Sequence, residues 1–140
     1  MIAIVVCCQA NLASALAEAA AGVLGGRSQL IAVDCPADQC EDTLTDIIVE
    51  TIANSGADRA LILTDLYGAP PANAAAAALP RVPLETAILT GVNLPSVLEA
   101  ARLAETAESL CTLSERVRAA AQAGIRSVTR RTDATLENDA

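Results

Sequence analysis

The chain of 140 residues is predicted to form one α/β domain, with a parallel sheet covered by helices on both faces. Three observations support this fold class. Strand-like and helix-like stretches alternate along the chain with short connections. The strand-like stretches are continuous apolar runs, as expected of strands that are buried on both faces. A chain of this length can also bury about 68–70% of its unfolded surface around a single core.

The first half of the chain is expected to hold two strand–helix pairs. Residues 2–7 form a continuous apolar run and are predicted to be the first strand. Asn11 offers a helix N-cap, residues 12–24 carry apolar side chains at helical spacing, and two glycines then end the helix. Residues 30–33 are predicted to be a short second strand. Acidic residues open the segment 38–54, which favours a helix because carboxylates stabilise a helix N-terminus.

The second half repeats this alternation. Residues 60–64 are predicted to be the third strand, 72–79 a helix that stops at Pro80, and 86–90 the fourth strand. Helices are expected over about 96–104 and 113–123, the latter with its C-cap at Gly124. Residues 125–132 alternate and contain β-branched side chains, which favours a fifth strand. The tail 133–140 is polar, and we expect it to be frayed.

Composition excludes several classes of partner. Nine arginines, no lysines and 17 carboxylates give a formal charge of −8, which disfavours nucleic acid and anionic membrane surfaces. The sequence shows no apolar run long enough to span a membrane and no signal peptide, so no membrane insertion is expected. Five cysteines without framework spacing indicate free thiols in the cytoplasm. Cys35 and Cys40 lack further ligands nearby, so neither a metal site nor a cofactor is expected.

Three segments follow predicted strands and should meet at one edge of the sheet, where ligands bind in parallel α/β folds. They are residues 8–11, 64–73 and 90–95. Asp65 directly follows a buried strand, and an acid in that position more often belongs to a site than to a cap. Asn11 and Asn73 fit helix caps better than ligand donors. Residues 91–95 fit a turn followed by a helix start.

These segments, in their order and spacing, resemble the enzyme IIA domain of the mannose family of the bacterial phosphoenolpyruvate-dependent sugar phosphotransferase system. The resemblance covers residues 1–128, and residues 129–140 would be the end of the last strand and a flexible polar tail. The matching stretches are 1–6, 11–13, 61–68, 71–75, 90–95 and 123–125.

The resemblance implies a phosphocarrier domain. In the family, a histidine after the first strand takes a phosphoryl group from the histidine phosphocarrier protein and passes it to a IIB domain. Asp65 matches the aspartate that orients this histidine, and residues 68–71 match a Gly-rich loop that holds the phosphoryl oxygens. The family also forms homodimers, in which a C-terminal antiparallel strand crosses to the partner's sheet of four parallel strands. Residues 125–132 occupy that place.

The chain departs from the family at the residues that carry phosphate. Cys8-Gln9-Ala10 stands where the family has Thr-His-Gly, so Gln9 occupies the phosphoacceptor position. A carboxamide nitrogen has no nucleophilic lone pair, and the chain contains no histidine at all. Gly68-Ala69-Pro70-Pro71 replaces Gly-Gly-Ser-Pro, and proline offers neither a hydroxyl nor an N–H to an oxyanion. Asp65, Asn11 and Asn73 are retained.

Two nearby side chains have more than one interpretation. Cys8 could accept a phosphoryl group as a thiolate, although Asp65 would oppose the negative charge. A buried small apolar role is the better interpretation of Cys7 and Cys8. Tyr67, the only aromatic residue, could line the cleft or a protein contact, or could pack against the fold.

We therefore expect a degenerate enzyme IIA-like protein that binds and regulates partners. Its site residues would be Gln9 and Asp65, with Asn11, Tyr67, Gly68, Ala69 and Asn73 around them. The alternatives are an active phosphocarrier in sugar uptake that uses Cys8, and a small-ligand sensor at the same cleft. The expected partners are a second copy of the chain and a histidine phosphocarrier protein or IIB-type domain.

Overall fold

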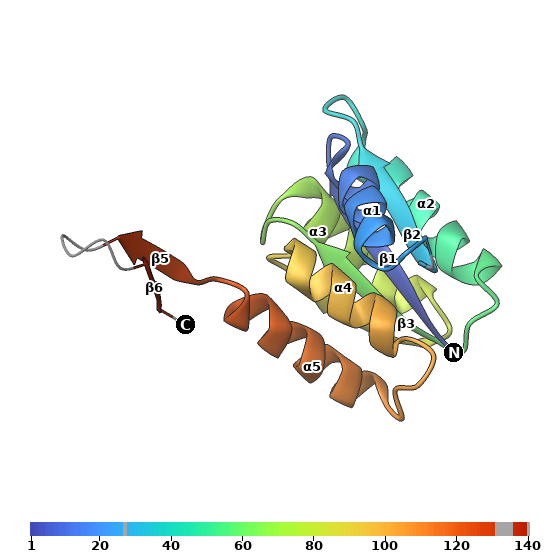
Figure 1. Cartoon of the computed structure of the whole chain (residues 1–140). Coiled ribbons are helices and arrows are strands. Elements are labelled where there is room, and N and C mark those ends of the chain that lie inside the picture. The colour runs from blue at the N-terminus through green and yellow to red at the C-terminus, as the bar shows by residue number, and fades with distance from the viewer. Residues whose placement is uncertain (27, 131–135, 140) are drawn as a thin grey trace.

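The computed structural model describes residues 1–26, 28–130 and 136–139. Its main sheet has four strands in the order β2-β1-β3-β4, and all neighbouring pairs run parallel. Helices cover both faces of this sheet (Figure 1), so the predicted three-layer α/β fold is confirmed. The strands are β1 (Ile2–Gln9), β2 (Leu30–Cys35), β3 (Arg59–Thr64) and β4 (Glu85–Leu89).

The strand β1 lies inside the sheet and explains the long apolar run at the start of the sequence. Its residues 2–8 are all buried. Side chains alternate between the two faces of a strand. Ile4, Val6 and Cys8 accordingly pack into one core layer, while Val5 and Cys7 pack into the other. Both layers are covered by helices, so both sets of positions are apolar.

The helices divide between the two faces. One face packs against α1 (Leu12–Val23), α4 (Leu94–Leu103) and α5 (Leu110–Ala123). The other packs against α2 (Glu41–Asn54) and α3 (Pro70–Ala78), which is followed by a 3-10 turn, η1 (Leu79–Arg81). The α3 residues in this core are alanines (Ala74, Ala75 and Ala78), so the helix backbone lies close to the sheet. Each buried Leu or Ile elsewhere contributes about 1.5–3 kcal/mol.

Several helices begin at a different residue from the predicted one. The helix α5 begins three residues early, because the Ser109 hydroxyl accepts the Thr112 N–H at 3.0 Å and caps the helix there. The helix α2 begins three residues late, because the Gln39 N–H bonds to the Pro36 carbonyl at 2.9 Å and forms a turn. The helices α3 and α4 each begin two residues early, since proline is tolerated in a first helical turn. The strands β1 and β2 each extend two residues further than predicted.

The C-terminal segment leaves the main sheet. The strand β5 (Ser127–Arg130) pairs antiparallel with β6 (Leu136–Asp139) in a separate two-stranded sheet. Figure 1 shows this pair of strands reaching away from the helices, and we call residues 125–130 and 136–139 the arm. The predicted fifth strand is thus present as β5. Residues 136–139, expected to be frayed, form β6 instead, because pairing with β5 satisfies their backbone polar groups. The rest of the predicted strand and tail lies outside the described residues.

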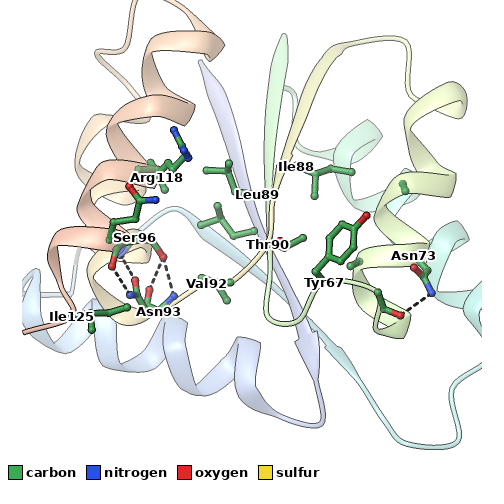
Figure 2. A pocket seen from close by; sticks show the side chains of 18 residues that line it. Tyr67, Asn73, Ile88, Leu89, Thr90, Val92, Asn93, Ser96, Arg118 and Ile125 are labelled. Atoms are coloured by element: carbon green, nitrogen blue, oxygen red, sulfur yellow. Dashed lines mark hydrogen bonds between the residues drawn. The ribbon is translucent and has the colours of Figure 1, made fainter.

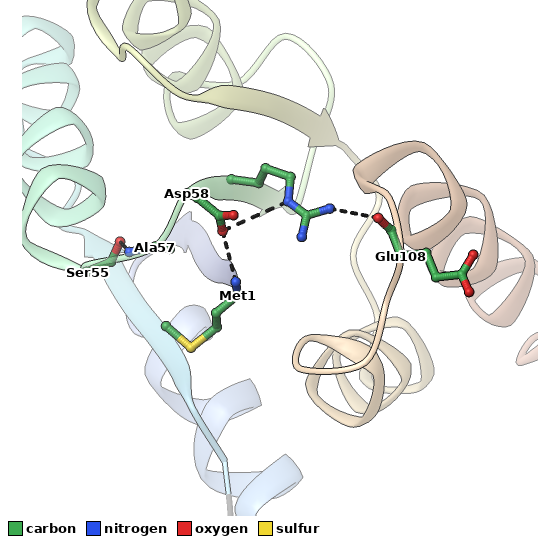
Figure 3. Close-up of polar contacts among 6 residues, drawn as sticks. Met1, Ser55, Ala57, Asp58 and Glu108 are labelled. Atoms are coloured by element: carbon green, nitrogen blue, oxygen red, sulfur yellow. Dashed lines mark hydrogen bonds and ion pairs between the residues drawn. The ribbon is translucent and has the colours of Figure 1, made fainter.

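Ion pairs close the edge of the sheet at which the strands begin. The Met1 amino group donates to Asp58 Oδ1 at 2.9 Å, and Arg59 Nη1 donates to the Glu108 carbonyl at 3.1 Å (Figure 3). The hydrogen bond from the amino group, supported by a backbone bond, holds the pKa of Asp58 below its ordinary value. This edge lies at the other end of the strands from the predicted site. Within the described residues, no helix is long and apolar enough to cross a membrane.

Candidate functional site

The structure brings Gln9 and Asp65 together, as the order of the strands requires. Cys7 on β1 pairs with Thr64 on β3, so the residues that follow these two strands lie side by side. The Gln9 backbone N–H donates to Asp65 Oδ2 at 2.9 Å, and the Gln9 side chain donates from Nε2 to the same oxygen at 3.3 Å. We call this pair and the loop residues 66–73 the strand-end site.

Protein donors bind both oxygens of the Asp65 carboxylate. Its second oxygen, Oδ1, accepts the Leu66 N–H at 2.9 Å, so three N–H groups hold one carboxylate. Hydrogen bonds to a charged acceptor are stronger than neutral ones and fix its orientation. The Gln9 amide is therefore oriented with its nitrogen toward Asp65. Within the part of the chain that the structure describes, the other amide atom, Oε1, accepts no hydrogen bond.

Ala10 holds a backbone conformation that glycine adopts more easily. Its φ is +52°, in the left-handed region, where a Cβ atom costs about 1–2 kcal/mol. The Ala10 N–H donates to the Cys35 carbonyl at 2.8 Å, which fixes this turn against β2. The chain thus changes direction between β1 and α1 through a strained residue. Ala10 stands at the position where the enzyme IIA family that this sequence resembles has glycine.

A second carboxylate at this edge, Asp34, was not among the predicted site residues. It lies on β2, where it accepts the Ser14 N–H at 3.0 Å and also the Ser14 hydroxyl. Asn11 occupies the N-cap position of α1 but makes no side-chain capping bond, so Asp34 satisfies the helix start in its place. The signal was available in the sequence. Asp34, like Asp65, is an acid at the end of an apolar strand.

Cys8 is enclosed in the core and does not face the site. Its side chain is fully buried, in the layer beneath α1, α4 and α5. Burial, together with the charges of Asp65 and Asp34, raises the pKa of Cys8 from 9.0 to about 12. Cys7 faces the other layer, and burial raises its pKa to about 12 as well. Near pH 7 only about one Cys8 in 10⁵ would be a thiolate, the form that reacts as a nucleophile.

The loop 66–73 carries exposed apolar side chains on a braced backbone. Leu66 is 59% exposed and Tyr67 is 86% exposed. Asn73 Nδ2 donates to the Gly68 carbonyl at 3.2 Å, so Asn73 braces the loop and does not cap a helix. Gly68 has φ +82°, which favours glycine. Ala69, at the N-cap position of α3, is buried.

A cavity of about 720 Å³ lies behind this loop, between α3 and α5 along the outer edge of β4 (Figure 2). We call it the slot. Among the predicted site residues, Tyr67, Gly68 and Asn73 line the slot, and the other five do not. The loop therefore has two sides, with Gln9 and Asp65 on one and the slot on the other. No group of three or more potential metal ligands occurs in the described residues.

Comparisons with known proteins agree with this fold. The crystal structure of a phosphotransferase system component EIIA from Streptococcus agalactiae superposes with a TM-score of 0.82 at 21% identity, covering 89% of this chain and 95% of that chain. A mannose/sorbose specific IIA subunit of the phosphotransferase system from Enterococcus faecalis gives 0.82 at 19%, covering 92% and 96%. A sigma-54 interaction domain protein from Enterococcus faecalis gives 0.75 at 20%, covering 88% and 92%.

These structural likenesses show the fold. A search of the curated proteins found no match. The family described as PTS system fructose IIA component, the mannose-type enzyme IIA family, matches residues 3–118. This match spans most of the chain and includes the strand-end site, so the chain belongs to the mannose-type enzyme IIA family of the phosphotransferase system.

Proposed function

We propose that this enzyme IIA family member does not carry a phosphoryl group and acts by binding a protein partner at the strand-end site. The observation that supports this most directly is the Gln9–Asp65 pair. The phosphoacceptor position holds an amide that donates to the carboxylate at 3.3 Å, in a chain without histidine. An amide nitrogen has no free lone pair with which to attack phosphorus.

The surroundings of Gln9 are also poorly suited to a phosphoryl group. Pro70 removes an N–H group and the hydroxyl of the family's serine from the start of α3, where an anion would otherwise bind. Asp34 adds a second carboxylate beside Asp65, which matches the family's own aspartate, and both charges act on the adjacent Cys8. A dianionic phosphoryl group would be repelled there.

Exposed apolar side chains at the rim of the strand-end site offer a contact surface for a protein partner. Leu12, Leu66 and Tyr67 are 40%, 59% and 86% exposed, and exposed apolar groups of this kind are common at protein contacts. By the resemblance, the partner would be a histidine phosphocarrier protein or a IIB-type domain. A regulatory role also fits the structural neighbour that is titled a sigma-54 interaction domain protein. Free thiols and these partners support a cytoplasmic location.

Transfer of labelled phosphate tests the proposal. The chain is incubated with phosphoenolpyruvate, enzyme I and the histidine phosphocarrier protein, and we expect no stable label. Gln9→His should take some label, because an imidazole at this position would face Asp65. Gln9→His combined with Ala69→Gly and Pro70→Ser should take more, because the loop regains groups that hold phosphate.

Stoichiometric labelling of the unaltered chain would refute the proposal. The active-phosphocarrier alternative would be correct if that label showed the stability in acid and base of phosphocysteine and were lost in Cys8→Ser. A folded triple variant without label would show that these three residues do not suffice for phosphoryl transfer from the phosphocarrier protein. A bound metabolite detected by mass spectrometry would favour the small-ligand sensor.

We also propose that the chain is a homodimer in which each arm fills the slot of its partner. The strand β4 is the last strand of the sheet, so one of its edges is open. The slot runs along that edge between two helices that present small side chains, Ala72 and Ala76 from α3 and Ala121 from α5. This is the space that one further strand would take, covered on both faces.

The arm has the properties of the missing strand. The strand β5 pairs with β6 and not with the main sheet, and Ile125 and Val128 are 80% and 62% exposed. Exposed strand edges and apolar side chains favour pairing with another chain. Sedimentation of the full chain over a range of concentrations should give a dimer, and a monomer at every concentration would contradict the exchange.

A further inference from the structure

The segment 90–95, which joins β4 to the first two residues of α4, holds the backbone at the end of β3, next to the strand-end site. The Gly91 N–H donates to the Asp65 carbonyl and the Val92 N–H to the Thr64 carbonyl, each at 3.0 Å. Gly91 has φ +81°, a conformation that favours glycine. The backbone of Asp65 is thus held by this segment, while its carboxylate holds Gln9.

The same segment fixes the base of the arm. Asn93 Nδ2 donates to the Ala121 carbonyl in the last turn of α5 at 2.9 Å (Figure 2). Gly124, where the arm leaves α5, packs directly on Pro95. A Cβ atom on Gly124 would lie 2.6 Å from Pro95 Cγ, so only glycine fits without displacement. The direction in which the arm departs is therefore set by contacts with the segment 90–95.

The two functions of Asn93 are carried by different atoms. Asn93 Oδ1 accepts the Ser96 N–H at 3.0 Å and caps α4, whereas Nδ2 makes the bond to Ala121. An aspartate at this position would keep the cap, since Asp is as good an N-cap as Asn. It would lose the donor and place a carboxylate oxygen against the Ala121 carbonyl. The bond to α5 can thus be broken while the start of α4 is preserved.

We propose that the strand-end site and arm exchange are energetically coupled through the segment 90–95, with Asn93 as the positioning residue. The inference rests on the proposed exchange. An arm seated in the partner's slot contacts the loop at Tyr67 and Gly68 and the segment at Thr90, which line the slot. Whatever changes the Gln9–Asp65 pair then changes the stability of the dimer. Such coupling is reciprocal, so a partner bound at the strand-end site would also be sensed by the arm.

The dimer dissociation constant of the full chain, measured by sedimentation, tests this coupling. Asp65→Asn removes the charge that holds Gln9 and should change the dissociation constant at least about fivefold, the lower end of couplings between sites. Gln9→Leu removes only the side-chain bond and should act in the same direction. It serves as a second variant if Asp65→Asn fails to fold. In an Asn93→Asp background the response to either change should fall below about twofold.

Ser109→Asp provides a matched control, because it adds the same charge at a helix cap at the other end of α5. The response to Asp65→Asn should persist in that background. An unchanged dissociation constant in both Asp65→Asn and Gln9→Leu overturns the coupling but leaves arm exchange intact. A response that persists in Asn93→Asp overturns the role of Asn93. A chain that stays monomeric overturns arm exchange and the coupling together, whereas phosphate labelling would refute only the non-catalytic function.

Discussion

The two sides of the loop 66–73 differ in how far their polar groups are hydrogen-bonded within the chain. On one side, Asp65 accepts three N–H groups, and a second carboxylate, Asp34, is occupied by Ser14. On the other side, the slot lies along an open strand edge, and the chain's own β5 is paired only with β6. The two carboxylates on the strand-end side are hydrogen-bonded within the chain, whereas the strand edge on the slot side is open. This difference supports the proposal that the chain acts by association.

At the strand-end site, solvent exposure and nucleophilic reactivity belong to different side chains. Gln9 is exposed but is not a nucleophile, while Cys8 is a potential nucleophile but is fully buried. A phosphocarrier needs both properties in one side chain. Each of the following predictions tests one side of this comparison.

The largest effect is expected in the reactivity of the thiols beneath the strand-end site. The pKa of Cys8 is raised from 9.0 to about 12, which lowers its thiolate fraction roughly 1,000-fold at pH 8. Cys40 and Cys111 are exposed and serve as internal controls. Iodoacetamide labelling of the native chain, followed by mass spectrometry, should modify these two at least about 1,000-fold faster than Cys8.

The pH dependence gives an independent check of the same prediction. Labelling of Cys8 should rise about tenfold for each pH unit from 7 to 11, because its thiolate is scarce throughout that range. A thiol of ordinary pKa should level off above pH 9. Rapid labelling of Cys8 at neutral pH would mean that the strand-end side is open, and would restore Cys8 as a candidate phosphoacceptor.

The slot side is tested by a proline in the arm. Val128→Pro removes one backbone N–H from β5, and an exchanged dimer contains two such arms. At about 0.5–1.5 kcal/mol for each lost hydrogen bond, the dimer should weaken roughly 5- to 150-fold. Val128→Thr keeps a β-branched residue with its N–H and should weaken the dimer much less. Equal sedimentation of both variants and the unaltered chain would exclude β5 from the interface.

The smallest effect concerns the strain at Ala10. Ala10→Gly relieves a left-handed alanine and should raise the free energy of unfolding by up to about 1 kcal/mol, measured by urea denaturation. Ala15→Gly makes the same chemical change at an exposed position of α1 and should lower stability by about 1 kcal/mol. Opposite signs for the two variants would support strain at the end of β1. A loss of stability in both would show that the turn at Ala10 is not strained.

The sequence predicted that Gln9 and Asp65 lie at one edge of the sheet, because strand ends in a parallel sheet are local features with a known location. The structure joins the two residues by hydrogen bonds, and their role as a site stays a prediction. Asp34 was missed, although it has the same sequence signal as Asp65. Asn73 was assigned to a cap because its spacing fits one, but its amide bonds to Gly68 in the folded loop. The slot was not foreseen, because it is formed by α3 and α5, which are far apart in the sequence.

The sequence by itself determined the α/β class, the order of the elements, the family and the absence of histidine, since these depend on apolar runs and on residue identity. Only the tertiary structure decided which side chains meet. It placed Cys8 in the core, gave the Asp65 carboxylate three donors, and left β4 with an open edge while β5 pairs only with β6. Burial and hydrogen bonding depend on neighbours from distant parts of the chain, and no local pattern of residues specifies them.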